Sequence, residues 1–235
     1  METPSELLAR WANSKCKNIS VGGLLARCPI AHKWKSPYRS LVIRETLFWR
    51  MHDLGQQAHL LFSNGHLLGA RILLRSALET LGILIYLNQR TNAVISGSFS
   101  FFEFSRLTMH LMLGSRNNST SHPAINILTI LQKAEKSHSG LVSLHERLSE
   151  SAHPNFDGVL YTYSASDPKK YETNFSNRWE QLFSKEQETA MLFVFTLFET
   201  EYNQVWSDLM LQLESWLRDN DATLESQKNG VPPFA

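Results

Sequence analysis

One stretch decides the fold: Leu67-Leu68-Gly69-Ala70-Arg71-Ile72-Leu73-Leu74-Arg75-Ser76-Ala77-Leu78-Glu79-Thr80-Leu81-Gly82-Ile83-Leu84-Ile85-Tyr86-Leu87. Drawn as a helix over about 66–87, it is apolar on almost every side, which is typical of a helix at the centre of a bundle. Asn64-Gly65, just before it, has the composition of a helix C-terminus. The apolar spacing upstream predicts a helix over about 38–63 that folds back against the central one as an antiparallel hairpin.

Further helices are predicted after this hairpin by helical spacing of apolar residues, at about 99–114, 124–137 and 140–152. Ser184-Lys185-Glu186-Gln187 has the pattern of a capping box and predicts the start of the longest helix, to about Asp219. We therefore expect an all-α, up-and-down helical bundle, with an N-terminal helical arm and a long C-terminal helix whose apolar face meets a second copy.

The less regular segments are predicted from their composition. Polar and small residues indicate a linker at 91–99, a loop at 115–123 and an aperiodic stretch at 154–177 that is functional or flexible. The resulting domain organisation is an N-terminal helix and irregular arm (1–37), a bundle domain (38–219) and a flexible tail (220–235).

A basic cluster within the N-terminal arm has two interpretations. With Trp34 and Tyr38 it offers charge and aromatic rings to a nucleic acid, or the segment straps the bundle. The cluster consists of His32, Lys33, Lys35 and Arg39.

Composition places the chain among ordinary intracellular proteins. The 235 residues carry a net charge of +1, so no overall field attracts nucleic acid or a membrane. Cys16 and Cys28 are the only cysteines, and a reduced, cytoplasmic setting suits them best. The beginning lacks a signal-peptide pattern and the apolar runs are too short to span a bilayer.

Arg71, Arg75 and Glu79 interrupt the central helix at intervals of four and so share one stripe. Charges on a buried helix are costly unless they are paired. Either Arg75 and Glu79 form an ion pair on one exposed edge, or the stripe supports a polar site on another helix.

The segment at 145–155 is the best candidate for such a site. His145, Ser149 and His153 are spaced by four, and Arg147 lies between them. Pro154 disfavours the α conformation for His153, so this histidine is expected at the helix end, where its side chain can turn towards Arg147. The alternative is a solvated helix end.

Other chemistry is disfavoured by spacing and by missing motifs. Two histidines about 12 Å apart along a helix do not share a metal ion, and Ser149 lacks an oxyanion hole. The sequence contains neither a phosphate-binding glycine loop nor a nucleophile elbow. We therefore expect no metal and no cofactor.

Two segments resemble signatures of the HEPN superfamily. Arg147-Leu148-Ser149-Glu150-Ser151-Ala152-His153 is similar to its arginine–histidine motif near a helix end, and Ala70–Thr80 is similar to a second-helix signature of HEPN-like bacterial and phage proteins. The resemblance implies a metal-independent endoribonuclease or RNA-binding protein. Such proteins are usually homodimers and often act as toxins, with an antitoxin partner, or in phage defence.

The resemblance also implies roles for individual residues. Arg147 would hold a phosphate group and His153 would transfer a proton. The residues expected to support or bind are Arg71, Arg75, Glu79, Ser149, Glu150 and Asn155.

Two further functions remain open. One is a non-catalytic dimeric helical module that binds a protein partner or effector, favoured by the neutral charge and by the apolar positions Leu209 and Leu213. The other is a small-ligand pocket formed by the charged stripe and the loop containing Tyr161 and Tyr163.

Overall fold

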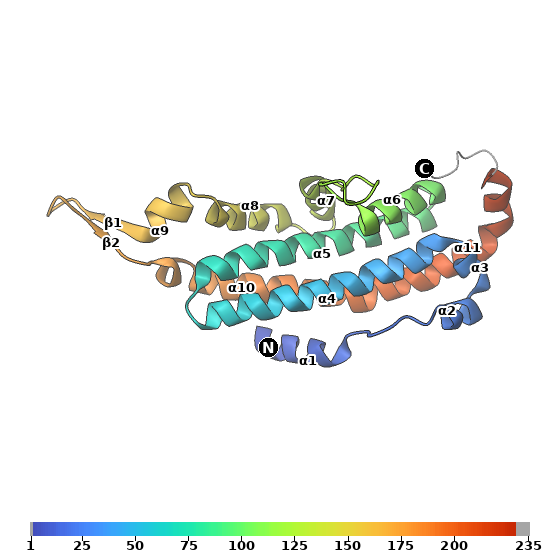
Figure 1. Ribbon diagram of the computed structural model, residues 1–235, viewed down its shortest axis with the longest axis horizontal. Coiled ribbons are helices and arrows are strands. Elements are labelled where there is room, and N and C mark those ends of the chain that lie inside the picture. The colour runs from blue at the N-terminus through green and yellow to red at the C-terminus, as the bar shows by residue number, and fades with distance from the viewer. Residues whose placement is uncertain (1, 229–235) are drawn as a thin grey trace. The chain divides into compact units, whose positions relative to one another are not determined.

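The computed structural model describes residues 2–228 of the chain, and these are mainly α-helical (Figure 1). The predicted all-α helical bundle is therefore confirmed. None of the helices within the described residues is both long and apolar enough to cross a membrane. The α-helices are α1 (Pro4–Ser14), α2 (Val21–Arg27), α3 (Pro29–Lys33), α4 (Lys35–Ser63), α5 (Leu67–Ile95), α6 (Phe101–Leu113), α7 (Ile127–Ala134), α8 (Leu141–Ala152), α9 (Tyr161–Tyr163), α10 (Trp179–Thr200) and α11 (Trp206–Lys228).

Contacts along the chain define two compact units. Unit 1 contains the residues up to Lys15, Trp49–Gly82 and Leu131–Phe198. Unit 2 contains Cys16–Phe48, Ile83–Ile130 and the residues from Glu199 onward. Each unit thus takes segments from three separate parts of the sequence.

In unit 1, the predicted hairpin of α4 and α5 is present. Gly65 lies between them with φ +75°, a conformation that favours glycine. A Cβ on Gly69 would lie 2.9 Å from Leu61 Cδ1, so the absence of a side chain lets the two helices approach. Gly55 does the same on α4, because a Cβ there would lie 2.8 Å from Leu8 of α1 and 3.1 Å from Phe195 of α10.

The central helix is longer than predicted. Residues 91–95, expected in a linker, form its last turns. Two polar side chains beyond the predicted end of the helix have buried partners: Thr91 Oγ1 donates to the Leu87 carbonyl at 2.9 Å, and Asn88 Nδ2 donates to the Glu201 carboxylate at 2.7 Å. Composition predicted a linker here because polar residues are typical of loops. It does not show which polar side chains have hydrogen-bond partners inside a helix bundle.

In unit 2, a buried polar network surrounds Tyr202. Its hydroxyl lies 2.9 Å from Glu45 Oε2, and its ring stacks on Phe48 with centroids 4.6 Å apart. The Arg44 guanidinium lies 3.5 Å from the Tyr202 ring centroid and pairs with Glu45. Burial raises the pKa of Tyr202 well above its ordinary value of 10. The hydroxyl therefore stays protonated and donates a hydrogen bond to Glu45.

The predicted capping box at Ser184 is wrong, because α10 begins five residues earlier. Trp179 is buried and its backbone N–H donates to Asn177 Oδ1 at 3.1 Å, so Asn177 caps the helix. Ser184 and Glu186 therefore lie inside the helix.

The long C-terminal helix also differs from the prediction. A π-helical turn, η2 (Glu201–Val205), separates α10 from α11. Leu209 and Leu213 are buried within unit 2, so they do not offer an apolar face to a second copy. The part of the predicted tail that the structure describes is helical to Lys228, whereas 229–235 lie outside the described residues.

The predicted irregular arm contains α2 and α3, and its basic cluster is bound to the protein itself. Lys33 Nζ lies 2.8 Å from Asp221 and 2.9 Å from Glu225. The Trp34 indole donates to Asp221 at 2.8 Å, and Arg39 donates to the Ser105 carbonyl at 3.1 Å. These contacts support the strap and leave little of the cluster for nucleic acid.

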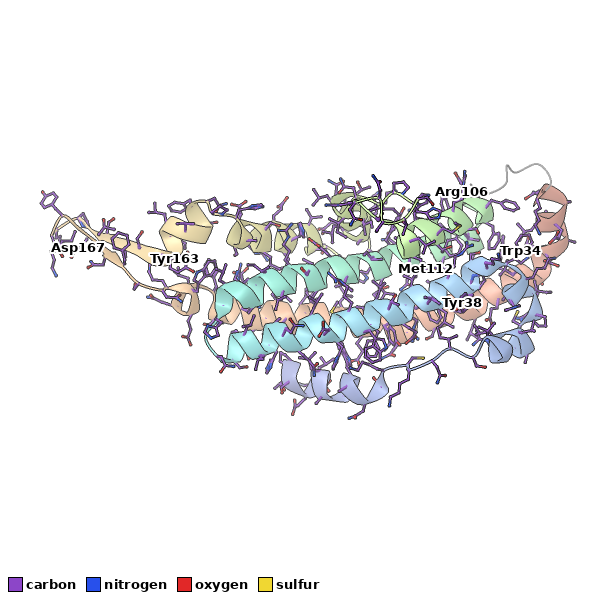
Figure 2. The ribbon with its side chains drawn as sticks, in the orientation of Figure 1. Trp34, Tyr38, Arg106, Met112, Tyr163 and Asp167 are labelled. Atoms are coloured by element: carbon purple, nitrogen blue, oxygen red, sulfur yellow. The ribbon has the colours of Figure 1, made fainter. Side chains whose placement is uncertain are left out.

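The aperiodic stretch 154–177 is more ordered than its composition predicted. A π-helical turn, η1 (Phe156–Leu160), leads through α9 into a hairpin of β1 (Ser164–Asp167) and β2 (Glu172–Phe175). Figure 2 shows Tyr163 and Asp167 beside the two ends of β1. The strands lack alternating apolar residues because most of their residues on both faces are exposed, so no period-2 pattern revealed them.

Candidate functional site

Helix α8 carries most of the predicted site residues. It begins after Gly140, whose φ is +96°, and the Glu135 carboxylate accepts the backbone N–H groups of Gly140 and Val142 at 2.7 and 2.9 Å. These two hydrogen bonds hold the pKa of Glu135 below its ordinary value. Leu141, Leu144 and Leu148 are buried, which fixes the rotation of the helix about its axis.

The first polar group on α8 is centred on Glu79 of α5. His145 Nε2 lies 3.0 Å from Glu79 Oε1, and Arg75 Nε donates to the same oxygen at 3.2 Å. Because a carboxylate only accepts, His145 carries its proton on Nε2. The hydrogen bond from His145 and the nearby Arg75 charge hold the pKa of Glu79 below its ordinary value.

Ser149 belongs to the same group but is not poised as a nucleophile. Its Oγ donates to the His145 carbonyl at 2.7 Å and lies 3.5 Å from His145 Nδ1. A serine hydroxyl has one proton, and the shorter contact uses it within the helix. Ser149, His145 and Glu79 are therefore a structural hydrogen-bonded group in this conformation.

The second polar group is centred on Glu186 of α10. Arg147 Nε donates to Glu186 Oε1 at 2.9 Å, and Arg71 Nη1 lies 3.4 Å from Glu186 Oε2. Arg71 also donates to Ser151 Oγ at 2.7 Å, and its guanidinium lies 4.4 Å from the Phe183 ring centroid. Two arginines from different helices thus share one carboxylate.

These two arginines have very different surroundings. The Arg71 side chain is 1% exposed, whereas that of Arg147 is 54% exposed and that of Glu186 is 33% exposed. Burial lowers the pKa of Arg71 below its ordinary value, and the positive charge of Arg147 adds to this effect. An arginine stays protonated even so, and Arg71 therefore depends on Glu186 for its counter-charge.

His153 ends α8 as Pro154 predicts. Its backbone is extended, with φ −94° and ψ 144°, and its side chain is exposed. Its carbonyl accepts the Asn155 N–H at 2.9 Å. Among the described residues, the imidazole has no hydrogen-bond partner.

Glu150 and Asn155 fix the chain after the helix end. Asn155 Nδ2 donates to Glu150 Oε2, and its Oδ1 accepts the Gly158 N–H at 3.0 Å. A Cβ on Gly158 would lie 2.0 Å from the His153 carbonyl oxygen, so only glycine permits this close turn. The backbone around His153 is therefore held in place although its ring is free.

The structure groups most of the predicted site residues in three sets, one of which is the pair of Glu150 and Asn155 at the end of α8. Arg75 and Glu79 share an ion pair, as one of the two interpretations predicted, and Glu79 also binds α8. Arg71 and Arg147 meet at Glu186. Arg147 binds Glu186, whereas the His153 ring has no hydrogen-bond partner among the described residues, so the structure does not bring these two side chains together.

Two residues of these groups were missed among the predicted site residues. His145 was noted for its spacing, but its partner on α5 has no signal in a single sequence. Glu186 was assigned to a helix cap, and this error concealed that its side chain faces Arg71 and Arg147.

Exposed apolar side chains follow His153 in the chain. Phe156 and Tyr161 stack with centroids 5.9 Å apart, and Tyr171 and Phe175 on the hairpin are 95% and 81% exposed. We call residues 156–175 the aromatic arm. Its other exposed large apolar residues are Val159, Leu160 and Tyr163.

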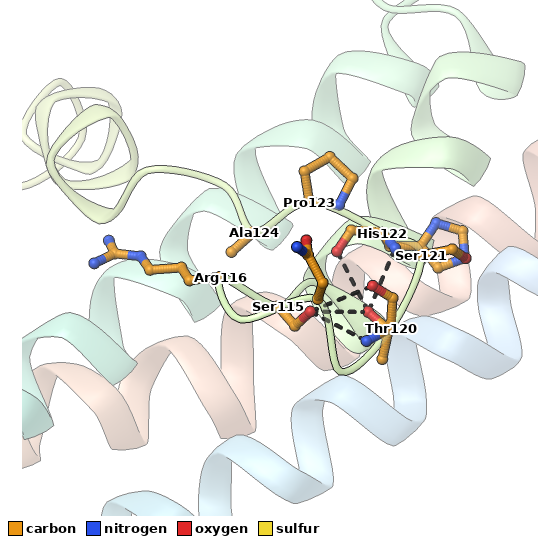
Figure 3. A pocket seen from close by; sticks show the side chains of 8 residues that line it. Ser115, Arg116, Thr120, Ser121, His122, Pro123 and Ala124 are labelled. Atoms are coloured by element: carbon orange, nitrogen blue, oxygen red, sulfur yellow. Dashed lines mark hydrogen bonds between the residues drawn. The ribbon is translucent and has the colours of Figure 1, made fainter.

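The ligand pocket expected near Tyr161 and Tyr163 has no support from their contacts. Tyr163 packs against Trp179, with centroids 6.3 Å apart, and Tyr161 packs against Phe156. A pocket of about 800 Å³ lies instead in the loop between α6 and α7 (Figure 3). There Ser115 and Thr120 bind each other, while the Arg116 side chain extends away from them.

Within residues 2–228, no three His, Cys, Asp or Glu side chains are close enough together to hold a metal ion. No protein-family model, curated protein or solved structure matches the chain. The resemblance to the HEPN superfamily thus rests on the two sequence signatures alone.

Proposed function

We propose that this protein binds RNA and cleaves it without a metal ion, with Arg147 holding a phosphate group and His153 transferring a proton. The observation that carries the proposal is the imidazole of His153, which is exposed and has no hydrogen-bond partner within residues 2–228. It lies at the end of the helix that also presents the half-exposed Arg147. Histidine is the side chain that most often transfers protons in general acid–base catalysis.

The chemistry needs few protein groups. The 2′-hydroxyl of RNA attacks the adjacent phosphorus, a base takes its proton, and the 5′-oxygen leaves with a proton. His153 would carry one of these protons and Arg147 would balance the negative charge on the phosphate oxygens. Exposed aromatic rings of the arm, beginning three residues after His153, would stack against RNA bases.

The biological setting is part of the same proposal. The resemblance to HEPN-like proteins favours a cytoplasmic homodimer that acts as a toxin or in phage defence, with an antitoxin or effector protein as a second partner.

Incubation of the purified protein with single-stranded RNA in EDTA tests the catalytic role. We expect cleavage, and a loss of about 100-fold or more in rate for His153→Ala, the range that general acid–base catalysis contributes. Arg147→Ala should also reduce the rate. His66→Ala is the matched control, because His66 is exposed and its side chain has no partner among the described residues. Uncut RNA, or equal rates for His153→Ala and the control, would remove the proposal.

A second candidate is a non-catalytic module whose partner is another copy of the chain. It is favoured by the exposed apolar residues of the aromatic arm and by the hairpin, a two-stranded ribbon of a kind that is marginal alone. The outer edges of β1 and β2 have no neighbouring strand among the described residues, so hairpins from two copies could pair.

Sedimentation of the wild type and of the double variant Tyr171→Ser, Phe175→Ser tests this candidate. We expect the wild type to dimerise and the double variant to be a monomer, with Arg147→Ala and His153→Ala leaving the dimer unchanged. A monomeric wild type would exclude the candidate.

A further inference from the structure

Glu186 lies where a bound anion would be expected. Arg147 and Arg71 approach it from α8 and α5, and each binds a different carboxylate oxygen. Two guanidiniums that converge on one group are a frequent arrangement for binding phosphate or carboxylate. In this structure the position between the two guanidiniums is occupied by the carboxylate of Glu186, a residue of the protein.

The charges of these three side chains do not balance. One carboxylate faces two guanidiniums, so the group keeps a net charge of +1. The Glu79 carboxylate does not correct the excess, because it is bound by Arg75 and His145. Free phosphate carries about one to two negative charges near neutral pH and so can neutralise both arginines. A phosphodiester of RNA carries one negative charge, like the carboxylate, and offers the two arginines two oxygens on one phosphorus.

The two contacts of Glu186 differ in how easily they are exchanged. The Arg147–Glu186 pair is exposed, and exposed ion pairs contribute little to stability. Arg71, in contrast, is held in place by Ser151 and by the Phe183 ring. The buried guanidinium thus stays fixed, while Arg147 and Glu186 are able to move.

We propose that Arg71 and Arg147 form an oxyanion site that Glu186 fills until a phosphate group displaces its carboxylate. Two oxygens on one phosphorus take over the two roles of the carboxylate oxygens, and Glu186, on the surface of α10, turns into solvent. This inference rests on the proposed function for the role of Arg147 with RNA. It assigns Glu186 as the group that limits the affinity for phosphate.

Binding measurements on Glu186→Gln at constant ionic strength test the site. Glutamine keeps the shape and still accepts a hydrogen bond from Arg71, but it removes the competing charge. We expect the affinity for both inorganic phosphate and a short single-stranded RNA to rise about two- to fivefold, as the loss of an exposed ion pair permits. Glu188→Gln is the control, because it removes the same charge from an exposed residue of α10 that has no partner among the described residues. An equal effect of both variants, or weaker binding by Glu186→Gln, would overturn the inference.

A second measurement covers the case that Glu186→Gln folds poorly. Inorganic phosphate should raise the melting temperature of the wild type and of Arg106→Gln, which changes an exposed arginine of α6, but not that of Arg147→Gln. An equal rise in Arg147→Gln would exclude the site.

The phosphate and RNA results separate the two proposals. Phosphate binding that follows this pattern, with RNA neither bound nor cut, keeps the oxyanion site and removes the proposed function. RNA cleavage that depends on His153, with equal phosphate binding by the Glu186 and Glu188 variants, does the reverse.

Discussion

Two polar groups among the described helices, one around Glu45 and the other around Glu186, differ in their access to water. In unit 2, Arg44 and Glu45 have side chains only 14% and 9% exposed, and the Tyr202 hydroxyl completes their hydrogen bonds. In unit 1, Arg71 is only 1% exposed, but the Glu186 that it contacts also binds Arg147, which is 54% exposed. A closed network can only stabilise a fold, whereas one that reaches solvent can also exchange its partner for a ligand.

The largest expected effect comes from breaking the closed network. Glu45→Ala removes the acceptor of both Arg44 and Tyr202 and leaves them buried without it. We expect a loss of about 3 kcal/mol in the free energy of unfolding, typical of a broken buried pair. Chemical denaturation measures it, with Glu188→Ala as a control expected to change by less than about 0.5 kcal/mol. Similar values for the two variants would show that the network is not closed.

A smaller effect is expected for Glu79 of α5, which is partly exposed and binds both His145 and Arg75. Its pKa lies below the ordinary 4.5 because His145 and then Arg75 stabilise the charged form. The resulting stability is therefore present above about pH 4.5 and is lost as the pH falls through the lowered pKa. Glu79→Gln should cost about 1 kcal/mol near pH 7.

The pH dependence supplies the control for this prediction. The difference between wild type and Glu79→Gln should shrink as unfolding is measured at successively lower pH below 4.5. A difference that stays constant down to the acid limit would mean that the charge of Glu79 makes no contribution, and that only its packing matters.

The sequence predicts the elements of this fold better than their partners. Apolar spacing located α4, α5, α6 and α8 to within a few residues at most ends. It could do so because the side of a helix that packs in the core has apolar residues at intervals of three and four. The pattern at Ser184 misled because a helix cap and a helix interior use the same residue types. Only the fold could tell that Asn177 provides the cap and that Glu186 faces two arginines.

The site shows the same limit. The stripe of Arg71, Arg75 and Glu79 was recognisable from its spacing by four, but the partners of Arg71 and Glu79 lie on other helices. A single sequence carries no information on such pairs. The hairpin of the aromatic arm was missed for another reason. Its strands are exposed on both faces, so their sequence lacks the alternation of apolar and polar residues that predicts a half-buried strand.

The smallest expected effect concerns His153, and it separates function from stability. Its ring is exposed and has no partner among the described residues, so His153→Ala should change the free energy of unfolding by less than about 0.5 kcal/mol. Chemical denaturation of this variant belongs beside the RNA assay, because a folded but inactive protein would place the loss in the chemistry. His145→Ala provides the contrast, since it removes a buried ring from Glu79 and should destabilise the protein measurably. If His153→Ala lowers the free energy of unfolding as much as His145→Ala does, the His153 ring contributes to the stability of the fold. It would then not be a free group available for proton transfer.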